Sequence, residues 1–371
     1  PAATGLQEYF RDIFFDSPWR DSGQQSLVYE NEAGHAAGFL GVIPRKMRFK
    51  GAPIKVAVAT QLMVDEETTP AYVAAKLVRR FLAGPQDLSL SDGANEAGGK
   101  LWRACGGEAA LLYSFNWTRA LRPAQFLNTR LKARRRIGVA ALPFSPVAWA
   151  MDACAELVSL SYWMPQAREA ERTRLSAEAL SEESLMQCMD QLGGRRALQP
   201  EYDRASLHWL LRQAGEKKNH GALKTALLRL QNGSIAGWYL CYMKAGGTAQ
   251  VLQYGARPDS FRAVMDHLFH SAWIEGAVAV TGGLEPRFAT ELASLRCRIT
   301  LPGYGVLMHS RHGDIAHAIH RGDAFLSRLE GEWWARFSDR EWSEVKAVAS
   351  PVIHNTARAP QLKAAHLSLR A

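Results

Sequence analysis

The sequence predicts an α/β (α+β) protein of two tandem domains, each with a mixed, mostly antiparallel sheet flanked by helices. Three observations support this class. Residues 54–117 alternate between strand-like and helix-like segments, the residues before them form short strands joined by turns, and a glycine pattern near residue 38 recurs near residue 237. Alternation of this kind predicts a sheet with helical crossovers, whose ligand crevice lies at the carboxyl ends of the strands.

The first predicted elements are a helix and an antiparallel meander. Apolar residues recur at helical spacing over 6–15, and Ser17-Pro18-Trp19 ends the pattern. The strands that follow are short, apolar and bounded by turn residues, and we expect them at 26–30, 36–44, 45–49 and 54–64.

The next stretch supplies the crossovers. Val73, Leu77, Val78 and Phe81 form one apolar face and predict a helix over 71–82, which Gly84-Pro85 ends. The remaining segments of this unit are predicted as a strand at 88–92, a helix at 95–105 and a strand at 109–117.

The chain then repeats itself. The pattern Gly-x-x-Ala-Gly-aromatic occurs twice, so that Gly38 and Gly237 lie 199 residues apart. Repetition at the spacing of a domain indicates duplication, because solenoid repeats are much shorter. The second copy is predicted to hold strands at 238–244, 248–254, 277–281 and 305–309, with helices at 260–274 and 286–295.

Length and composition agree with two folded domains. The 371 residues exceed the usual size of a single core, and 47% hydrophobic with 22% charged residues is an ordinary globular composition. We place the first domain at 1–125, a helical connector at 126–202, the second domain at 203–345 and an appendage at 346–371. The net charge of +9 suits an anionic partner such as a CoA phosphate or a nucleic acid.

The cysteines and the hydropathy indicate the compartment. Five cysteines are scattered singly, without a C-x-x-C pair, which disfavours a disulfide framework or a zinc knuckle and favours a reducing compartment. No apolar stretch is long enough to cross a bilayer, and no signal peptide opens the chain, so we expect a cytoplasmic protein without a membrane partner.

Residues 95–107 read Asn95-x-x-Gly98-x-x-Leu101-Trp102-x-x-x-Gly106-Gly107. This motif resembles N-x-x-A-x-x-L-Y-x-x-x-G-F of the GNAT superfamily of N-acetyltransferases. Residues 64–77 resemble its acyl-CoA segment V-x-P-x-x-R-x-x-G-x-G-x-x-L.

The acyl-CoA segment departs from the family at its pyrophosphate loop. Thr69 stands where the family has Arg or Gln, Tyr72 replaces the first glycine, and Ala74 occupies the second glycine position. Such a loop binds pyrophosphate through bare backbone N–H groups at a helix N-terminus, and glycine permits the close approach. The second copy has no equivalent of this loop, since Arg257-Pro258-Asp259 stands there.

The resemblance implies a tandem protein of the kind found among peptidoglycan-bridging aminoacyl-transferases, N-myristoyltransferases and aminoglycoside-modifying enzymes. It implies acetyl-CoA or another acyl-CoA as the donor, and a small-molecule or peptide amine as the acceptor. The residues that it places against the donor are Leu62, Met63, Val64, Thr69, Tyr72, Val73, Ala74, Asn95 and Trp102.

Acyl transfer needs alignment of amine and thioester and removal of a proton. Asp92 follows a predicted strand and is our candidate base, with the N-cap of the next helix, a role that Asp often has, as the alternative. Trp102 stands where the family has a proton-donating tyrosine. Tyr113 is our candidate for that role, with core packing as the alternative.

Three other features can be interpreted either as functional or as ordinary parts of the structure. The basic run 130–136, with Arg119 and Arg122 nearby, is either a solvated helix face or a clamp for an anionic partner. The four histidines within 309–320 share helical spacing, but Gly313 separates the pairs and we expect no metal. The aromatic and acidic segment 330–337 either packs on the second sheet or lines a groove between domains.

Two further functions stay open. One is a catalytically silent binding or scaffold protein, which the degenerate pyrophosphate loops favour. The other is a transferase that takes an aminoacyl group from tRNA, which is the only nucleic acid that we would expect as a partner. The sequence lacks the nucleophile elbow, P-loop, dinucleotide and H-E-x-x-H motifs. We therefore do not expect a common hydrolase, kinase, Rossmann oxidoreductase or metalloprotease.

Overall fold

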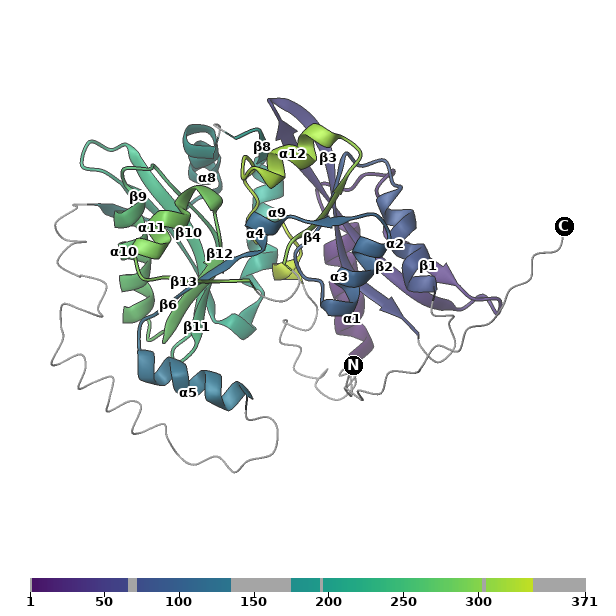
Figure 1. Cartoon of the computed structure of the whole chain (residues 1–371), viewed down its shortest axis with the longest axis horizontal. Coiled ribbons are helices and arrows are strands. Elements are labelled where there is room, and N and C mark those ends of the chain that lie inside the picture. The colour runs from purple at the N-terminus through teal and green to yellow at the C-terminus, as the bar shows by residue number, and fades with distance from the viewer. Residues whose placement is uncertain (1, 66–71, 135–174, 194–195, 302–304, 336–371) are drawn as a thin grey trace.

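The computed structural model describes residues 2–65, 72–134, 175–193, 196–301 and 305–335. Within these ranges the strands form two seven-stranded sheets (Figure 1). The first sheet contains β1 (Leu27–Glu30), β2 (Ala36–Phe49), β3 (Ala52–Val64), β4 (Leu88–Ser91), β5 (Glu108–Ala109), β8 (Leu198–Pro200) and β14 (Leu307–Ser310). The second contains β6 (Asn116–Ala120), β7 (Ser176–Glu178), β9 (Ala222–Arg229), β10 (Ile235–Met243), β11 (Thr248–Ala256), β12 (Ala279–Gly283) and β13 (Arg298–Thr300).

Helices and single turns connect these strands. The longer ones are α1 (Ala2–Phe10), α2 (Val73–Leu82), α3 (Glu96–Ala104), α5 (Pro123–Arg134), α8 (Glu182–Cys188), α9 (Arg204–Gly215), α10 (Phe261–Ile274) and α12 (Gly313–His320). The shorter ones are η1 (Arg11–Phe15), α4 (Leu111–Ser114), η2 (Met189–Gly193), η3 (Lys218–His220), η4 (Pro286–Phe288), α11 (Ala289–Ser294) and η5 (Trp333–Ala335).

Both sheets are mixed and mostly antiparallel, which confirms the predicted fold class. In the first sheet the parallel pair is β3 with β4, and in the second it is β11 with β12. In each case a helix, α2 or α10, connects the two parallel strands, as a crossover requires.

The predicted strand over 109–117 is wrong. The chain leaves β5 at Ala109, makes the helical turn α4, and starts β6 at Asn116. Ser114 supports the turn, because its hydroxyl donates to Ala110 O at 2.9 Å. The apolar run here fits either a strand or a helix, and packing decides in favour of the turn.

As a result, the two sheets exchange strands. β6 comes from the first half of the chain but pairs with β12 and β13 of the second sheet. β14 comes from the second half and lies between β4 and β5 of the first sheet. Figure 1 shows the blue β6 among the green strands of the second sheet. Residues 176–178 and 198–200, expected in a helical connector, are also strands.

The duplication predicted from the glycine pattern is visible in the structure. Gly38 lies on β2 and Gly237 on β10, the middle strand of an antiparallel meander in each sheet. Each glycine lies under the first helical turn that follows: an added Cβ would be 3.3 Å from Val73 Cγ1 at Gly38 and 2.8 Å from Val264 Cγ2 at Gly237. Close approach of a helix to the sheet explains why glycine recurs at this position.

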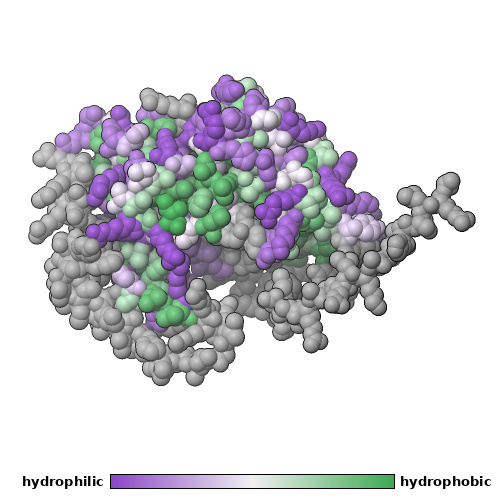
Figure 2. All heavy atoms as spheres, in the orientation of Figure 1, coloured by the Kyte–Doolittle hydropathy of each residue, from purple (hydrophilic) through white to green (hydrophobic). Residues whose placement is uncertain are grey.

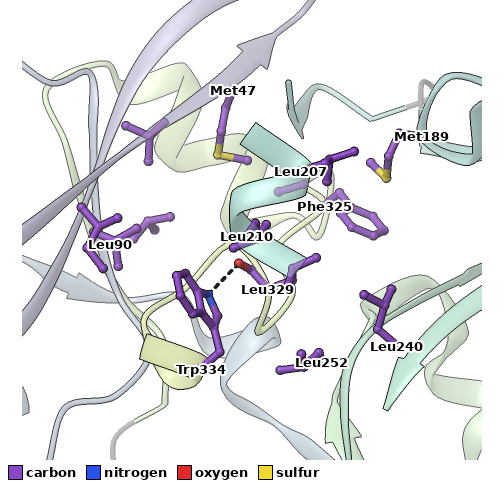
Figure 3. Close-up of a cluster of buried hydrophobic side chains, with 14 of the residues drawn as sticks. Met47, Leu90, Met189, Leu207, Leu210, Leu240, Leu252, Phe325, Leu329 and Trp334 are labelled. Carbon is purple, nitrogen blue, oxygen red and sulfur yellow. Dashed lines mark hydrogen bonds between the residues drawn. The ribbon is translucent and has the colours of Figure 1, made fainter. Parts of the chain in front are cut away.

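The largest core cluster lies between the two sheets. Met47 and Leu90 of the first sheet and Leu240 and Leu252 of the second contribute to it (Figure 3). α9 and the segment 324–335 fill the space between them, and Trp334 Nε1 donates to Leu329 O at 3.0 Å. A second cluster lies under α10 and α11, and a third under α2 and α3.

The outer surface carries mixed polar and apolar atoms. Figure 2 shows apolar atoms gathered near the middle of one face, where α4 lies in Figure 1, and Leu111 of α4 is 52% exposed. In the described ranges we find no helix with the length and apolar character that crossing a membrane requires.

Candidate functional site

The strands β3 and β4 separate at one end of the first sheet. They pair only between 56–58 and 88–90, after which β3 continues to Val64 without a strand partner on that side. A bulge interrupts the pairing of β3 with β2 here, and Gln61 has a φ of 51°. Such bulges redirect a strand, and they occur often beside active sites. The separation leaves one edge of β3 open to a ligand.

A crevice of about 470 Å³ opens at this separation; we call it the β3–β4 crevice. The end of β3, the first turn of α2 and the start of α3 form its walls. The donor-binding residues predicted from the sequence that line it are Leu62, Val64, Ala74, Asn95 and Trp102.

The other predicted donor-binding residues lie outside the lining of this crevice. Tyr72 is 60% exposed and Met63 is 45% exposed, whereas Val73 is buried in the core under α2. Thr69 lies outside the described residues. Tyr72 therefore does not fill the crevice, even though it replaces a glycine of the family pattern.

The first turn of α2 has features that favour an anion. It contains no acidic residue, and the residue at the cap position, Tyr72, makes no side-chain capping bond. The first N–H groups of a helix lack partners within the helix and carry partial positive charge. Because Ala74 lines the crevice, this helix end lies at its wall.

The motif of α3 has a clear structural explanation. Asn95 is the N-cap, since its Oδ1 accepts the Gly98 N–H at 2.8 Å. Trp102 is buried, and its Nε1 donates to Met308 O of β14 at 3.0 Å. Gly107 has no room for a side chain, because an added Cβ would lie 2.1 Å from Trp102 Nε1. The motif thus positions an indole as a wall of the crevice.

Asp92 binds the segment that follows Leu329. Its Oδ1 accepts the N–H groups of Glu332 at 2.6 Å and of Trp333 at 3.1 Å. The alternative interpretation of Asp92 as the N-cap of α3 is wrong, since Asn95 has that position. Asp92 instead fixes the start of the η5 turn against the end of β4.

Glu332 is a residue that sequence reasoning missed. It is 5% exposed and lines the β3–β4 crevice. Its Oε1 accepts the Ser91 hydroxyl at 2.7 Å and the Gly93 N–H at 3.0 Å. The acidic and aromatic composition of residues 330–337 was the available signal, but the sequence did not place this segment beside β4.

The segment around Glu332 is held firmly. The Tyr9 hydroxyl donates to Ala335 O at 2.9 Å, and Arg45 Nε donates to Glu330 O at 3.2 Å. The Arg45 guanidinium lies between the rings of Trp19 and Trp334, at 4.4 and 5.4 Å, and burial lowers its pKa to about 10. The crevice wall at Glu332 is therefore well ordered by several independent contacts.

Tyr113 is fixed on the short helix α4. Its hydroxyl donates to Ala324 O at 2.7 Å and accepts the Ala324 N–H at 2.9 Å. Burial raises the pKa of this hydroxyl, with the Glu285 carboxylate adding to the effect. Both hydrogen bonds join α4 to the segment leading to Phe325, so the Tyr113 hydroxyl has a structural role.

A second space of about 330 Å³ lies between the two sheets; we call it the inter-sheet cavity. Asp92 and Tyr113 line it from the first half of the chain, and Tyr254 and Glu285 line it from the second. Ala94 lines both spaces. Residues 91–94 and 331–333, which we call the partition, alternate between lining the crevice and lining the cavity.

The basic candidates that the structure describes bind main-chain carbonyls. Arg119 donates to Leu295 O, and Arg122 donates to Ala277 O and Trp273 O, which lie in or next to α10 and α11. Of the basic run, residues 135–136 lie outside the described ranges.

Three of the four histidines in 309–320 bind separate partners. His309 contacts Gly106 O, His312 contacts Asp87 Oδ1 and His320 contacts Glu108 Oε2, the last two at 3.0 Å. Across the part of the chain that is described, no group of three or more His, Cys, Asp and Glu side chains could hold a metal ion.

Comparison with known proteins adds to this picture. No family model and no curated protein matches the chain. A protein of unknown function from Enterococcus faecalis V583, described as a probable N-acyltransferase, is 11% identical with a TM-score of 0.51, over 82% of this chain and 65% of that one. A GCN5-related N-acetyltransferase from Anabaena variabilis ATCC 29413 is 12% identical with a TM-score of 0.50, over 83% and 66%.

A third solved structure is Saccharomyces cerevisiae N-myristoyltransferase with bound myristoyl-CoA, at 11% identity and a TM-score of 0.44, over 81% of this chain and 69% of that one. The chain spans about two thirds of the length of these proteins. At such identities the first two likenesses establish the architecture: the chain has the fold of the GCN5-related N-acetyltransferases, as the motifs of 64–107 predicted.

Proposed function

We propose that the protein is an N-acyltransferase that moves an acyl group from acyl-CoA, such as acetyl-CoA, to an amine. The observation that carries the proposal is the β3–β4 crevice, because it lies where the motifs placed the donor and contains five of the predicted donor-binding residues. The open edge of β3 can pair with the amide groups of the pantetheine arm, as an added strand would. The N–H groups at the N-terminus of α2, whose first turn has no acidic residue, would bind the pyrophosphate.

In the reaction, the amine nitrogen bonds to the thioester carbonyl carbon and the C–S bond breaks. The thiolate leaves with the electron pair, and the proton lost by the nitrogen ends on the sulfur. No oxidant or reductant is needed. We propose Asp92 as the base that receives the proton first, since it lines the inter-sheet cavity while its neighbours Ser91 and Gly93 line the crevice.

The decisive experiment measures binding and turnover of acetyl-CoA separately. Calorimetry should show a single site, and the melting temperature should rise with acetyl-CoA concentration, because a ligand of the folded state stabilises it by mass action, by about 2.7 kcal/mol at 100 times Kd. Release of free CoA thiol in the presence of an amine panel then measures transfer. Absence of binding by both acetyl-CoA and free CoA, the part that all acyl-CoA donors share, would refute the proposal.

A catalytically silent acyl-CoA-binding or scaffold role is the second candidate. It is favoured by the state of the two predicted catalytic residues, because Asp92 Oδ1 already accepts two main-chain N–H groups and the Tyr113 hydroxyl already binds Ala324 twice. This role predicts acetyl-CoA binding without thiol release for any amine. Salt-sensitive binding of tRNA, with no response to acetyl-CoA, would instead support the aminoacyl-tRNA alternative.

A further inference from the structure

The inter-sheet cavity has an apolar wall to which both sheets contribute. Leu90 of β4, Val251 and Leu252 of β11, and Phe325 after α12 line it, and all four are buried. A molecule in this space would therefore contact aliphatic and aromatic side chains from both halves of the chain.

The hydroxyl groups of the lining are used by the protein itself. The Tyr254 hydroxyl donates to Gly283 O at 3.2 Å and accepts the Glu285 N–H at 3.1 Å. The Ser114 hydroxyl accepts the Val306 N–H at 2.9 Å. These bonds hold the ends of strands and turns around the cavity, so the hydroxyls have a structural role already.

The carboxylates of the lining have partners as well. Glu285 forms an ion pair with Arg196 at 2.9 Å, and its carboxylate also accepts the main-chain N–H of Arg287. The Glu330 carboxylate accepts the Gln253 amide N–H at 3.0 Å. The other lining side chains that hydrogen-bond to the protein are Asp92, Tyr113, Ser327 and Arg328.

This arrangement decides which chemistry the cavity favours. A polar group that enters it loses its hydrogen bonds to water, and the polar side chains named above already bind the protein. A hydrocarbon group has no hydrogen bonds to lose and gains about 4-fold in affinity for each methylene that it buries. Asn116, the other polar residue of the lining, is only partly buried. The lining therefore favours an apolar ligand.

The cavity adjoins the β3–β4 crevice at the end of β4. Leu90 and Asp92 line the cavity, whereas Ser91 and Gly93 line the crevice, as expected when successive residues of an extended chain point to opposite sides. Ala94 lines both spaces. A group bound in the cavity is thus next to a donor bound in the crevice.

We propose that the inter-sheet cavity is a hydrocarbon pocket, which binds the apolar part of a substrate: the acyl chain of the donor or the apolar body of the amine. The inference rests on the proposed acyl transfer for the role of the ligand, and on the cavity alone for its chemistry. A space of about 330 Å³ is within the range of pockets for small organic molecules, so an alkyl chain of medium length or a single aromatic ring fits this volume.

Gly283 offers a way to fill the cavity without changing its walls. It lines the cavity at the end of β12, and an added Cβ would have no heavy atom within 4 Å. Its φ lies outside the left-handed region, and Trp117 and Tyr254 bind its main-chain carbonyl, which Gly283→Leu keeps. Gly215→Leu at the exposed end of α9 is the matched control, since an added Cβ there also meets no atom within 4 Å.

Two substrate series test for a gain with chain length. Calorimetry measures Kd for acetyl-, butyryl-, hexanoyl- and octanoyl-CoA. Thiol release with acetyl-CoA measures kcat/KM for ethyl-, butyl-, hexyl- and octylamine. In one series we expect a rise of about 4-fold per methylene until the cavity is filled. Gly283→Leu should reduce the advantage of the longest favoured chain by about 10-fold or more, because leucine takes part of the space, and Gly215→Leu should follow the parent.

Toluene tests the cavity without a thioester or an amine. Calorimetry should show that it binds the parent and Gly215→Leu, and that it binds Gly283→Leu about 10-fold more weakly or less. Gly283→Ala keeps the test interpretable if Gly283→Leu lowers the melting temperature. It adds a single methyl group, so the advantage of the longest favoured chain should fall by about 4-fold.

The outcomes separate this proposal from acyl transfer. A gain along the acyl-CoA series assigns the cavity to the donor, and a gain along the amine series assigns it to the acceptor. If acetyl-CoA is bound and consumed but neither series gains, or the gain is unchanged in the Gly283 variants, the hydrocarbon pocket is wrong and acyl transfer stands. If toluene binds the parent but not Gly283→Leu, while free CoA and its thioesters are neither bound nor consumed, the chemistry of the cavity stands and the acyl-transfer function is wrong.

Discussion

The main-chain N–H of Glu332 donates to Asp92 Oδ1 at 2.6 Å, and the Glu332 carboxylate in turn accepts the Gly93 N–H at 3.0 Å. These reciprocal bonds join segments that are 240 residues apart. They place one carboxylate on the wall of the inter-sheet cavity and one on the wall of the β3–β4 crevice. The contact of the two residues therefore joins the two segments and connects the walls of the two spaces.

Two substitutions of Asp92 separate the clamp from the proposed base. Asp92→Asn keeps an oxygen that can accept from Glu332 and Trp333, so unfolding should change by less than about 1 kcal/mol. It cannot take a proton, and kcat/KM should fall by about 100-fold or more. Asp92→Ala should lower activity and also destabilise by about 1–3 kcal/mol, since it leaves two N–H groups unpaired. Urea unfolding and thiol release measure the two effects. An Asp92→Asn enzyme with normal turnover would leave Asp92 only its structural role.

Ala74→Phe should block the donor crevice. Ala74 lines the crevice at the first turn of α2, and its side chain is only partly buried, so a phenyl ring can project into the space without entering the core. We expect acetyl-CoA affinity to fall by about 10-fold or more, with little change in melting temperature. Ala83→Phe, at the exposed far end of the same helix, is the matched control and should bind as the parent does. Equal affinities of the two variants would place the donor elsewhere.

Tyr113→Phe should affect stability more than catalysis. The substitution leaves the N–H and C=O of Ala324 without their phenol partner, at a cost of about 1–3 kcal/mol. Because burial raises the pKa of Tyr113, its hydroxyl stays protonated over any practical assay range and contributes no limb to the pH–rate profile. Thermal unfolding and kcat at several pH values check this. A large loss of kcat with unchanged stability would restore the proton-donor role.

The sequence predicted the part of the site that short-range patterns describe. Periodicity located α2 and α3, and the resemblance of 64–107 to the acetyltransferase motifs implied that Val64, Ala74, Asn95 and Trp102 face one ligand. All four line one crevice in the structure. Such a motif is informative because a strand, a crossover helix and the next strand fix each other's positions within a few dozen residues.

The rest of the site depends on contacts that are remote in sequence. Glu332 reaches β4 only because the chain returns between the sheets after α12. Glu285 and Asn116 line one cavity only because β6 crosses into the second sheet beside β12. The apolar run at 111–117 has no period that distinguishes a strand from a turn. No local sequence pattern therefore predicts the exchange of strands between the sheets.

Substitution of the two repeated glycines should give different results. At Gly237 an added Cβ would lie 2.5 Å from Gly255 O and 2.8 Å from Val264 Cγ2, so the backbone of β11 must move. At Gly38 the nearest atoms are side-chain carbons at 3.2–3.3 Å, which can shift slightly. Gly237→Ala should therefore destabilise by about 1–3 kcal/mol, the usual range for overpacking, and Gly38→Ala by clearly less. Similar losses for both in urea unfolding would contradict this difference.

Glu330 should give stability an unusual pH dependence. It is buried among Tyr202, Gln253 and Ser327, and burial raises its pKa above the ordinary value of 4.5, although hydrogen bonds and Arg45 oppose the shift. The folded state therefore holds this proton to higher pH than the unfolded state does. The stability that the proton contributes is fully present below pH 4.5 and is lost as the pH rises through the folded pKa.

Glu330→Gln does not titrate, so the unfolding free energy of the parent, relative to this variant, should fall as the pH rises from 4.5 toward neutrality. Glu8→Gln on the surface of α1 is the control and should run parallel to the parent. A difference between parent and Glu330→Gln that grows with pH would mean that Arg45 and the hydrogen bonds outweigh burial, and that the carboxylate stabilises the space between the sheets as an anion.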